Sequence, residues 1–284
     1  MIYGVTGNAD KSGIENVLFD LINIFEENKI KYYLNDNFKS FLPDNTNIHK
    51  LNSFINKIDI LISLGGDGTF LNTVSKIGNH SVPILGVNLG RLGFLSEIVP
   101  SELRKFILNI EHKKYKIDNL CVLSAYTPDK KFISGINEIV IDKCNSTRII
   151  EIEIFYNNER VLNFLADGVI VSTPTGSTGY SLSSGGPIIT PYSKVLIITP
   201  ICPHSLNFRP IIVPDDGKIF ITAKSHEKIR ITADGHTTKI FKSPVEITIH
   251  KSGHQVKTVK KMNKTYFQTL NNKLLWGADI RHKY

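Results

Sequence analysis

The segment 64–71, with the sequence LGGDGTFL, places one carboxylate among glycines directly after an apolar run. Glycine lets a backbone approach a phosphate group without a Cβ in the way, and the start of a following helix offers free N–H donors. Asp67 in such a loop can accept a hydroxyl proton or orient a metal ion, and phosphoryl transfer uses both. Because Gly and Asp also dominate ordinary turns, the segment alone leaves a simple turn open.

A second segment, 167–187, concentrates glycines and hydroxyl side chains. It supplies many small donors and acceptors for sugar hydroxyls and phosphate oxygens. Linkers share this composition, but apolar stretches flank the segment on both sides, which favours a binding loop.

Asn137 and Glu138 interrupt the otherwise apolar run 136–142. An amide and a carboxylate suit hydrogen bonds to an adenine edge or to ribose hydroxyls. Successive residues of a strand face opposite sides, so these two share a face only if a bulge or a strand end intervenes. A solvated strand end is the alternative reading.

Several standard chemistries lack their motifs. The chain has no Gly-Lys-Ser/Thr loop, no G-x-G-x-x-G fingerprint, no H-E-x-x-H helix and no G-x-S-x-G elbow. Its three cysteines are odd in number and far apart, which excludes a disulfide framework and a structural zinc site.

The composition is that of an ordinary globular protein: 284 residues, 41% hydrophobic and 21% charged. No apolar stretch approaches the roughly 18 residues of a membrane span, so no membrane partner is expected, and the start of the chain lacks a secretion signal, which predicts a cytoplasmic location. The net charge of +8 attracts anions. The densest basic stretch, Lys257 to Lys264, has no arginine cluster with interleaved aromatic residues, so no nucleic-acid partner is expected.

Alternating strands and helices must position the first loop. Apolar runs at 2–5, 58–64 and 83–87 predict strands, and the helical spacing of apolar residues predicts helices over 14–29 and 101–111. That order is typical of a parallel sheet with crossover helices.

The second loop lies in a region of short β-branched runs separated by turn signals such as Asp234-Gly235. We therefore predict an α/β plus all-β protein: a Rossmann-like α/β domain over 1–105 and a β-rich, β-sandwich-like domain over 106–262. A helix over 263–275, closed by Trp276-Gly277, makes 263–284 a segment that returns to the first domain.

Taken in order, these markers resemble the NAD kinases, which phosphorylate the 2'-hydroxyl of the adenosine ribose of NAD with ATP to give NADP. The resemblance covers roughly 58–214 and continues more loosely to Trp276-Gly277. It rests on the ordered set GGDGT at 65–69, GVNLGRLGF at 86–94, Asn137-Glu138, the segment 167–183, and Pro203-His204 with Arg209-Pro210. It implies the two-domain fold above, NAD bound between the domains, and a homodimer or homotetramer whose neighbouring subunit helps to complete the site.

The same resemblance implies a role for each matching residue. Asp67 corresponds to the family's general base, and Gly68 adjoins it in the nucleotide site. Asn137 and Glu138 correspond to a pair that faces the NAD adenosine and ribose. The remaining matches are Asp167, Thr178, Tyr180 and Ser183 as dinucleotide contacts, Arg148 at a basic or polar position, and Asn72 at a variable position that reaches ligand in some members.

Two positions depart from the family pattern: Gly179 stands where Ala is most frequent, and His236 where Gln is usual. A divalent cation, Mg²⁺ first among them, is expected to accompany the triphosphate of ATP. Two alternatives remain open. A lipid or sugar kinase shares the first loop, although no membrane-docking stretch or lipidation signal is present. A non-catalytic nucleotide-binding protein has no reason to keep Asp67 beside phosphates.

Overall fold

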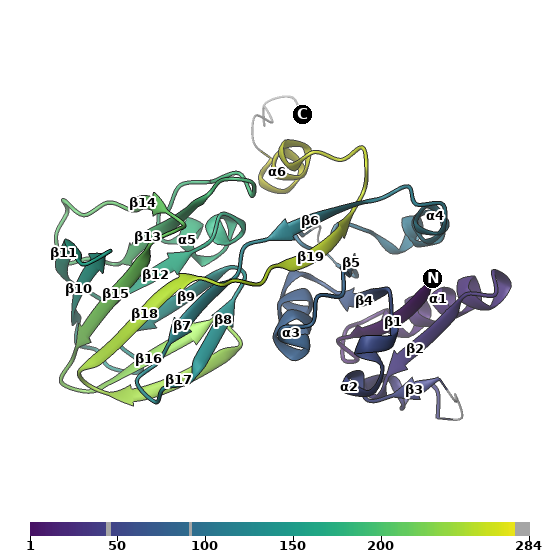
Figure 1. The fold of residues 1–284 in the computed structure, drawn as a ribbon, viewed down its shortest axis with the longest axis horizontal. Helices are drawn as coiled ribbons and strands as arrows, with labels where there is room; N and C mark the ends of the chain where they lie inside the picture. The colour runs from purple at the N-terminus through teal and green to yellow at the C-terminus, as the bar shows by residue number, and fades with distance from the viewer. Residues whose placement is uncertain (44–46, 91–92, 276–284) are drawn as a thin grey trace, which may run out of the picture. The chain divides into compact units, whose positions relative to one another are not determined.

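The structure is a computed structural model that describes residues 1–43, 47–90 and 93–275. The chain forms two compact units (Figure 1): one of Met1–Asn119 with Val256–Tyr284, the other of Leu120–Gln255. The second unit is therefore inserted into the first. The strands that flank the insertion, β6 (Lys116–Leu120) and β19 (Val256–Lys260), belong to the sheet of the first unit.

In the first unit, seven strands among the described residues form one sheet in the order β3-β2-β1-β4-β5-β19-β6. The pairings from β3 to β19 are all parallel. In chain order the elements are β1 (Ile2–Gly7), α1 (Ile14–Glu27), β2 (Lys31–Asn35), η1 (Asp36–Phe38), β3 (Ile48–His49), α2 (Leu51–Phe54), η2 (Ile55–Lys57), β4 (Ile60–Gly65), α3 (Asp67–Ile77), β5 (Ile84–Asn88), α4 (Pro100–Glu111), β6 (Lys116–Leu120), β19 (Val256–Lys260) and α6 (Tyr266–Leu274).

The central strand β4 is buried along its whole length, as expected for a parallel strand covered on both faces. Strand order reverses beside β1, which has β2 on one side and β4 on the other. Open α/β sheets bind ligands at the carboxyl ends of the strands next to such a reversal. The turn from β4 into α3 carries Asp67 to this edge of the sheet.

The second unit contains two antiparallel sheets, ordered β11-β10-β15-β18-β7-β8 and β14-β13-β12-β9-β16-β17. Inward-facing residues of both sheets join in one apolar cluster, which makes the unit a β-sandwich. The elements are β7 (Leu123–Tyr126), β8 (Phe132–Gly135), β9 (Glu138–Asp142), β10 (Ile150–Tyr156), β11 (Glu159–Ala166), β12 (Gly168–Ser172), η3 (Thr175–Thr178), α5 (Tyr180–Ser183), β13 (Val195–Ile201), β14 (Ile211–Pro214), β15 (Lys218–Lys224), β16 (Lys228–Ala233), β17 (Thr237–Lys242) and β18 (Val245–Lys251).

The predicted fold class is confirmed: an α/β unit and an all-β unit. The Asp234-Gly235 turn joins β16 to β17 with both residues at positive φ and a His236 N–H bonded to Ala233, the geometry of a tight hairpin. The predicted helix over 263–275 is α6, whereas Trp276-Gly277 lies outside the described residues. Within the described ranges, each helix is too short or too polar to cross a membrane.

Candidate active site

Asp67 is the first residue of α3, where a negative charge is favourable beside the free N–H groups of a helix start. Its carboxylate accepts three successive backbone N–H groups from the segment after β5. Phe94 donates to Oδ2 at 2.8 Å, and Leu95 and Ser96 donate to Oδ1 at 3.1 and 2.9 Å. We call these three N–H groups the Asp67 seat. They fix the carboxylate by main-chain atoms rather than by side chains.

Gly93 makes the Asp67 seat sterically feasible. A Cβ at this position would overlap the carboxylate of Asp67 far inside van der Waals contact. Since the colliding atoms belong to a carboxylate held by three hydrogen bonds, they cannot move aside cheaply. A side chain at residue 93 is therefore incompatible with the observed seat.

Lys273 on α6 supplies the one ionic contact of Asp67 among the described residues. Its ammonium lies 3.3 Å from Oδ2 and 4.2 Å from the centre of the Phe94 ring. A carboxylate offers about four acceptor positions. The seat and Lys273 together fill all of them, although 26% of the Asp67 side chain remains exposed.

The other two predicted residues of this unit also lie on α3. Gly68 follows Asp67 directly and is exposed. Asn72 is half-buried, and five residues along a helix turn its side chain by about 140° from Asp67. Gly68 therefore adjoins the Asp67 seat, whereas Asn72 lies on a different side of α3.

In the second unit, Asp234 holds the start of β9. It accepts the N–H of Ile136 on Oδ2 at 2.8 Å, and those of Asn137 and Glu138 on Oδ1 at 2.8 and 3.1 Å. The strand begins at Glu138 rather than at Ile136, so Asn137 lies just outside it. This is the strand end that lets the neighbouring amide and carboxylate face the same surroundings.

Glu138 is buried, and its Oε2 has no hydrogen-bond partner in the structure. Burial, together with the negative charge of Asp234, raises the pKa of Glu138 to about 7, although the Tyr180 N–H opposes that shift. A Cβ on Gly179 would lie 3.0 Å from this Oε2 and 3.6 Å from the Asn137 amide nitrogen. Asn137, Glu138 and Gly179 therefore meet at one place.

The loop after β12 is anchored to the same strand end. Thr173 donates its hydroxyl to the Ile136 carbonyl at 2.6 Å and its N–H to the Asn137 carbonyl at 2.9 Å. Beyond this anchor, Thr178 bonds the Thr175 carbonyl, and Ser183 is exposed at the end of α5.

Tyr180 connects this cluster to two aspartates. Its ring is 45% exposed, and its pKa is raised by partial burial and by the nearby charges of Asp142 and Asp167. Asp167 pairs with Lys143 at 2.7 Å, and Asp142 makes a bidentate pair with Arg230. The structure therefore groups Asp167 with Tyr180 in a polar, charge-balanced surface.

The last two predicted residues are exposed on turns. Arg148 precedes β10, with its N–H bonded to the Ser146 hydroxyl. His236 ends the hairpin turn that carries Asp234, whose pKa is raised by burial against the opposing effect of its three N–H donors. The structure associates His236 with the Glu138 cluster through Asp234, whereas no contact links Arg148 to it among the described residues.

Sequence reasoning missed Lys273, Asp234 and Lys143. Asp234 was read only as a turn residue, since a carboxylate that accepts main-chain N–H groups has no sequence signature. Lys143 follows Asp142 on a turn, and its partner Asp167 is distant in the chain. Of the three, only Lys273 lies at a position that the sequence marks, since it is a cation in the last turn of a predicted helix. Nothing in the sequence pairs it with Asp67.

Two family models match the chain. One, described as the ATP-NAD kinase N-terminal domain, matches residues 15–115, and the other, the ATP-NAD kinase C-terminal domain, matches residues 136–261. An NAD kinase of Bacteroides fragilis is 38% identical over 99% of this chain and 98% of its own length. An NAD kinase of Clostridium botulinum is 39% identical over 97% and 96%.

Solved structures agree with these relatives. Yeast NADH kinase in complex with NADH superimposes with a TM-score of 0.91 at 27% identity, covering 100% of this chain and 90% of that one. An NAD kinase from Archaeoglobus fulgidus in complex with ATP gives a TM-score of 0.80 at 26% identity, covering 97% and 99%. The fold and these relatives thus define a dinucleotide kinase. The chain belongs to the NAD kinase family.

Proposed function

We propose that the chain transfers the γ-phosphoryl group of ATP to the 2'-hydroxyl of the adenosine ribose of NAD. The observation that carries the proposal is the Asp67 seat: a carboxylate fixed at a helix start on the ligand-binding edge of a parallel sheet. The two solved structures, one in complex with NADH and one with ATP, support the two substrates.

Asp67 acts as the general base. As the ribose oxygen attacks the γ-phosphorus, a new O–P bond forms, ADP leaves with the electron pair of the broken bond, and the hydroxyl proton passes to Asp67. Phosphoryl transfer has a loose transition state, so late proton removal by a weak base suffices and orientation dominates.

Lys273 must release Asp67 for this step. The carboxylate has no acceptor position left, and the Lys273 contact of 3.3 Å is the longest of its four. The γ-phosphate carries more charge than a carboxylate, so its arrival draws the ammonium away from Oδ2. That exchange frees Oδ2 for the proton while Lys273 holds the phosphoryl group.

The polar cluster of the second unit binds the dinucleotide. Asn137 and the buried Glu138 offer an amide and a carboxyl group to the adenosine and ribose, and the exposed ring of Tyr180 offers a stacking surface. The other members of the proposed contact set are Gly68, Asn72, Arg148, Asp167, Thr178, Gly179, Ser183 and His236.

A metal ion enters on the nucleotide rather than on the protein in this proposal. Over the described residues, no three His, Cys, Asp or Glu side chains gather in a geometry suited to a metal ion. The oxygens of Asp67 are also committed to N–H donors. Mg²⁺ bound to the triphosphate supplies neutralisation of phosphate charge.

The chain also works as a homodimer or homotetramer in this proposal. Exposed apolar side chains on edge strands of the second unit support it: Phe132 on β8 is 65% exposed and Ile240 on β17 is 51% exposed. Light scattering on the purified protein measures the subunit number. A cytoplasmic location stays a prediction from the sequence.

The test is incubation of the purified chain with NAD, ATP and Mg²⁺, followed by detection of NADP with a strictly NADP-dependent dehydrogenase. Diacylglycerol and sphingosine serve as parallel acceptors. We expect NADP and no phosphorylated lipid. A protein that binds NAD but forms no NADP with ATP would contradict the proposal.

A further inference from the structure

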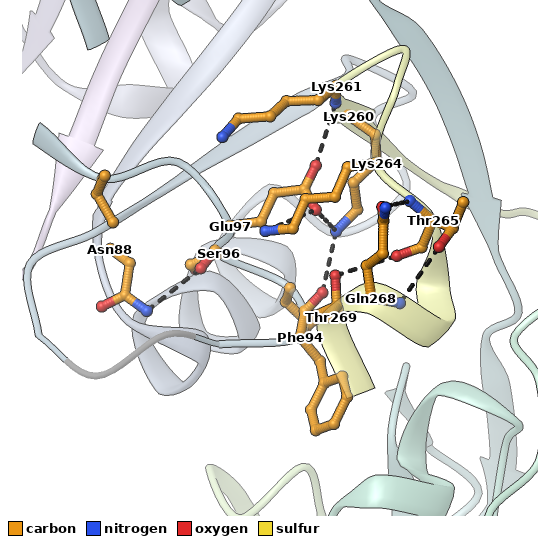
Figure 2. A network of polar contacts seen from close by, with 12 residues as sticks. Asn88, Phe94, Ser96, Glu97, Lys260, Lys261, Lys264, Thr265, Gln268 and Thr269 are labelled. Carbon is orange, nitrogen blue, oxygen red and sulfur yellow. Dashed lines mark hydrogen bonds and ion pairs between the residues drawn. The ribbon is translucent and has the colours of Figure 1, made fainter. Parts of the chain in front are cut away.

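Glu97 is a buried carboxylate that directly follows the Asp67 seat. Its side chain is 7% exposed, and three lysines of the C-terminal segment surround it (Figure 2). Oε1 accepts the Lys261 N–H at 3.1 Å, and the ammonium groups of Lys260 and Lys264 each lie 3.8 Å from Oε2. Glu97 thus ties the segment after β5 to the end of β19, across a large separation in sequence.

Lys260 is the last residue of β19, and its side chain is only 12% exposed. Its ammonium donates a 3.0 Å hydrogen bond to the Phe94 carbonyl oxygen. Burial lowers the pKa of Lys260 below its ordinary value, and Glu97 opposes that shift. Desolvating such a pair costs about as much as the ions gain from each other, so stability alone does not account for it.

The Phe94–Leu95 peptide group lies between two charges. Its carbonyl oxygen accepts from the Lys260 ammonium, and its N–H, carried by Leu95, donates to Oδ1 of Asp67. A cation on the oxygen end of an amide polarises the group and strengthens the hydrogen bond given by the N–H end. One peptide plane therefore connects the buried lysine to the carboxylate of the base.

Further contacts keep this peptide plane in place. Asn88 donates to the Ser96 carbonyl at 3.2 Å, so the segment is held from β5 as well (Figure 2). A capping box between Thr265 and Gln268 fixes the start of α6 directly after Lys264. The positions of the lysines around Glu97 are thus set by a strand end on one side and a helix start on the other.

We propose that Lys260, with Glu97 as its counter-charge, is a positioning residue for the phosphoryl transfer: its ammonium fixes the Phe94–Leu95 peptide group and so orients Asp67. The inference rests on the proposed function, because it takes Asp67 as the base. Lys260 reaches Asp67 through this peptide group, by the Phe94 carbonyl and the Leu95 N–H.

The central variant is Lys260→Met, which keeps the length and apolar stem of the side chain and removes the ammonium. We expect kcat for NADP formation to fall about 10- to 100-fold, since small misplacements of a catalytic group have effects of this size. The KM values for NAD and ATP should change by less than about threefold, because substrate contacts are intact. Lys105→Met, an exposed lysine on α4 of the same unit, is the matched control and should match the wild type.

A second readout does not depend on activity. Hydrogen exchange measured by mass spectrometry reports on the amides of residues 93–97. In Lys260→Met we expect faster exchange of this peptide, while the exchange of β4 stays unchanged. If the wild type forms no NADP, the proposed function fails, whereas this exchange measurement still tests the link between Lys260 and the Asp67 seat.

The double variant Glu97→Gln/Lys260→Met separates positioning from stability. Glu97→Gln alone leaves Lys260 buried without its counter-charge, so the melting temperature of the double variant should exceed that of Glu97→Gln. The hydrogen bond to the Phe94 carbonyl stays absent, and kcat should therefore stay low. A kcat that recovers together with the melting temperature would overturn the inference, as would wild-type kcat and wild-type exchange in Lys260→Met.

Discussion

Asp67 in the first unit and Asp234 in the second are each held by the same arrangement of main-chain N–H groups. Each carboxylate accepts three successive main-chain N–H groups, the first on Oδ2 and the next two on Oδ1. Each triplet follows a glycine, Gly93 or Gly135, where a Cβ would run into the carboxylate. The geometry of the N–H groups therefore does not decide which aspartate does chemistry.

The two aspartates differ in the fourth partner of the carboxylate and in their surroundings. Asp67 has Lys273 at 3.3 Å as its fourth partner, and 26% of its side chain is exposed. Asp234 has the carboxyl group of Glu138 nearby instead, and burial raises its pKa despite the three N–H donors. A seat of main-chain N–H groups immobilises a carboxylate in both places. A base results only where one acceptor position can be vacated for a proton.

The largest expected effect comes from Asp67→Asn, which removes the proposed general base. An amide keeps the size of the side chain but turns an NH₂ group towards the donors of the seat and cannot take the proton. Turnover should fall about 10²- to 10⁴-fold, the range for a lost general base. NAD affinity, measured by titration calorimetry, should stay within a few-fold. A near-wild-type rate would remove Asp67 from the base role.

Asp234→Asn should instead lower stability. It loses charge-assisted bonds to the N–H groups of Ile136, Asn137 and Glu138, and the free energy of unfolding should drop by about 2 kcal/mol. Urea denaturation measures the drop. Turnover per folded molecule should fall far less than in Asp67→Asn. An unchanged denaturation midpoint would show that the hydrogen bonds to Asp234 do not stabilise the fold, and would contradict this difference between the two aspartates.

Glu138→Gln should stabilise the protein in a pH-dependent way. The pKa of Glu138 is about 7 in the folded state and near its ordinary value of 4.5 in the unfolded state. Only the unfolded chain loses this proton between those values, so the wild type loses stability as pH rises from about 4.5 to 7. Glu138→Gln does not ionise at this position, so its free energy of unfolding does not fall for this reason over the same pH range.

Denaturation at pH 5 and pH 8 measures the difference. The stability advantage of Glu138→Gln over the wild type should be about 2 kcal/mol larger at pH 8 than at pH 5, since one pH unit corresponds to about 1.4 kcal/mol. Equal advantages at both pH values would mean that Glu138 ionises normally. Glu246→Gln, an exposed glutamate on β18, is the control.

Lys273→Met tests the fourth partner of Asp67. We expect about a tenfold lower kcat and a higher KM for ATP, because the variant removes one charge-assisted contact to phosphate. Lys273→Arg should restore part of the ATP affinity. Initial rates over a range of ATP concentrations give both constants. A change confined to the KM for NAD would contradict the exchange of Lys273 from Oδ2 to phosphate.

The smallest effect is expected from Gly179→Ala, which introduces the residue that the resemblance to the family leads us to expect at this position. The new Cβ would lie 3.0 Å from Glu138 Oε2, so that carboxyl group must shift by a few tenths of an ångström. The change in NAD binding free energy should stay below about 1 kcal/mol. A loss of NAD affinity beyond tenfold would show that Glu138 cannot move.

Periodicity and turn chemistry predicted much of the fold. The buried strands β4 and β12, the helices α1 and α4, and the Asp234-Gly235 hairpin follow from patterns within a few residues. The place of β19 in the first sheet did not, because its sequence VKTVK is basic and alternating, and its pairing with β5, Thr258 opposite Ile84, joins segments far apart in the chain. Strands so far apart in the sequence have no local pattern that predicts their pairing.

For the site, the sequence predicted Asp67 and the pair Asn137 and Glu138, because carboxylate and amide side chains stand out among glycines and apolar residues. It did not predict what holds them, since every backbone carries N–H groups and neither Gly93 nor Gly135 reveals that an aspartate needs its space. The stretch from Lys257 to Lys264 was counted only as net charge, yet three of its lysines contact Glu97 or Glu102.

The insertion of the β-sandwich into the α/β unit sets an order of events during synthesis. The strand that carries Lys260 leaves the ribosome only after the whole sandwich, long after Asp67 and its N–H donors. A chain that stalls or is cut before Val256 contains the complete second unit and the GGDG loop but lacks Lys260 and Lys273. In the proposal, such a fragment would hold Asp67 and its N–H donors without the lysine that positions the base and the lysine that exchanges from it.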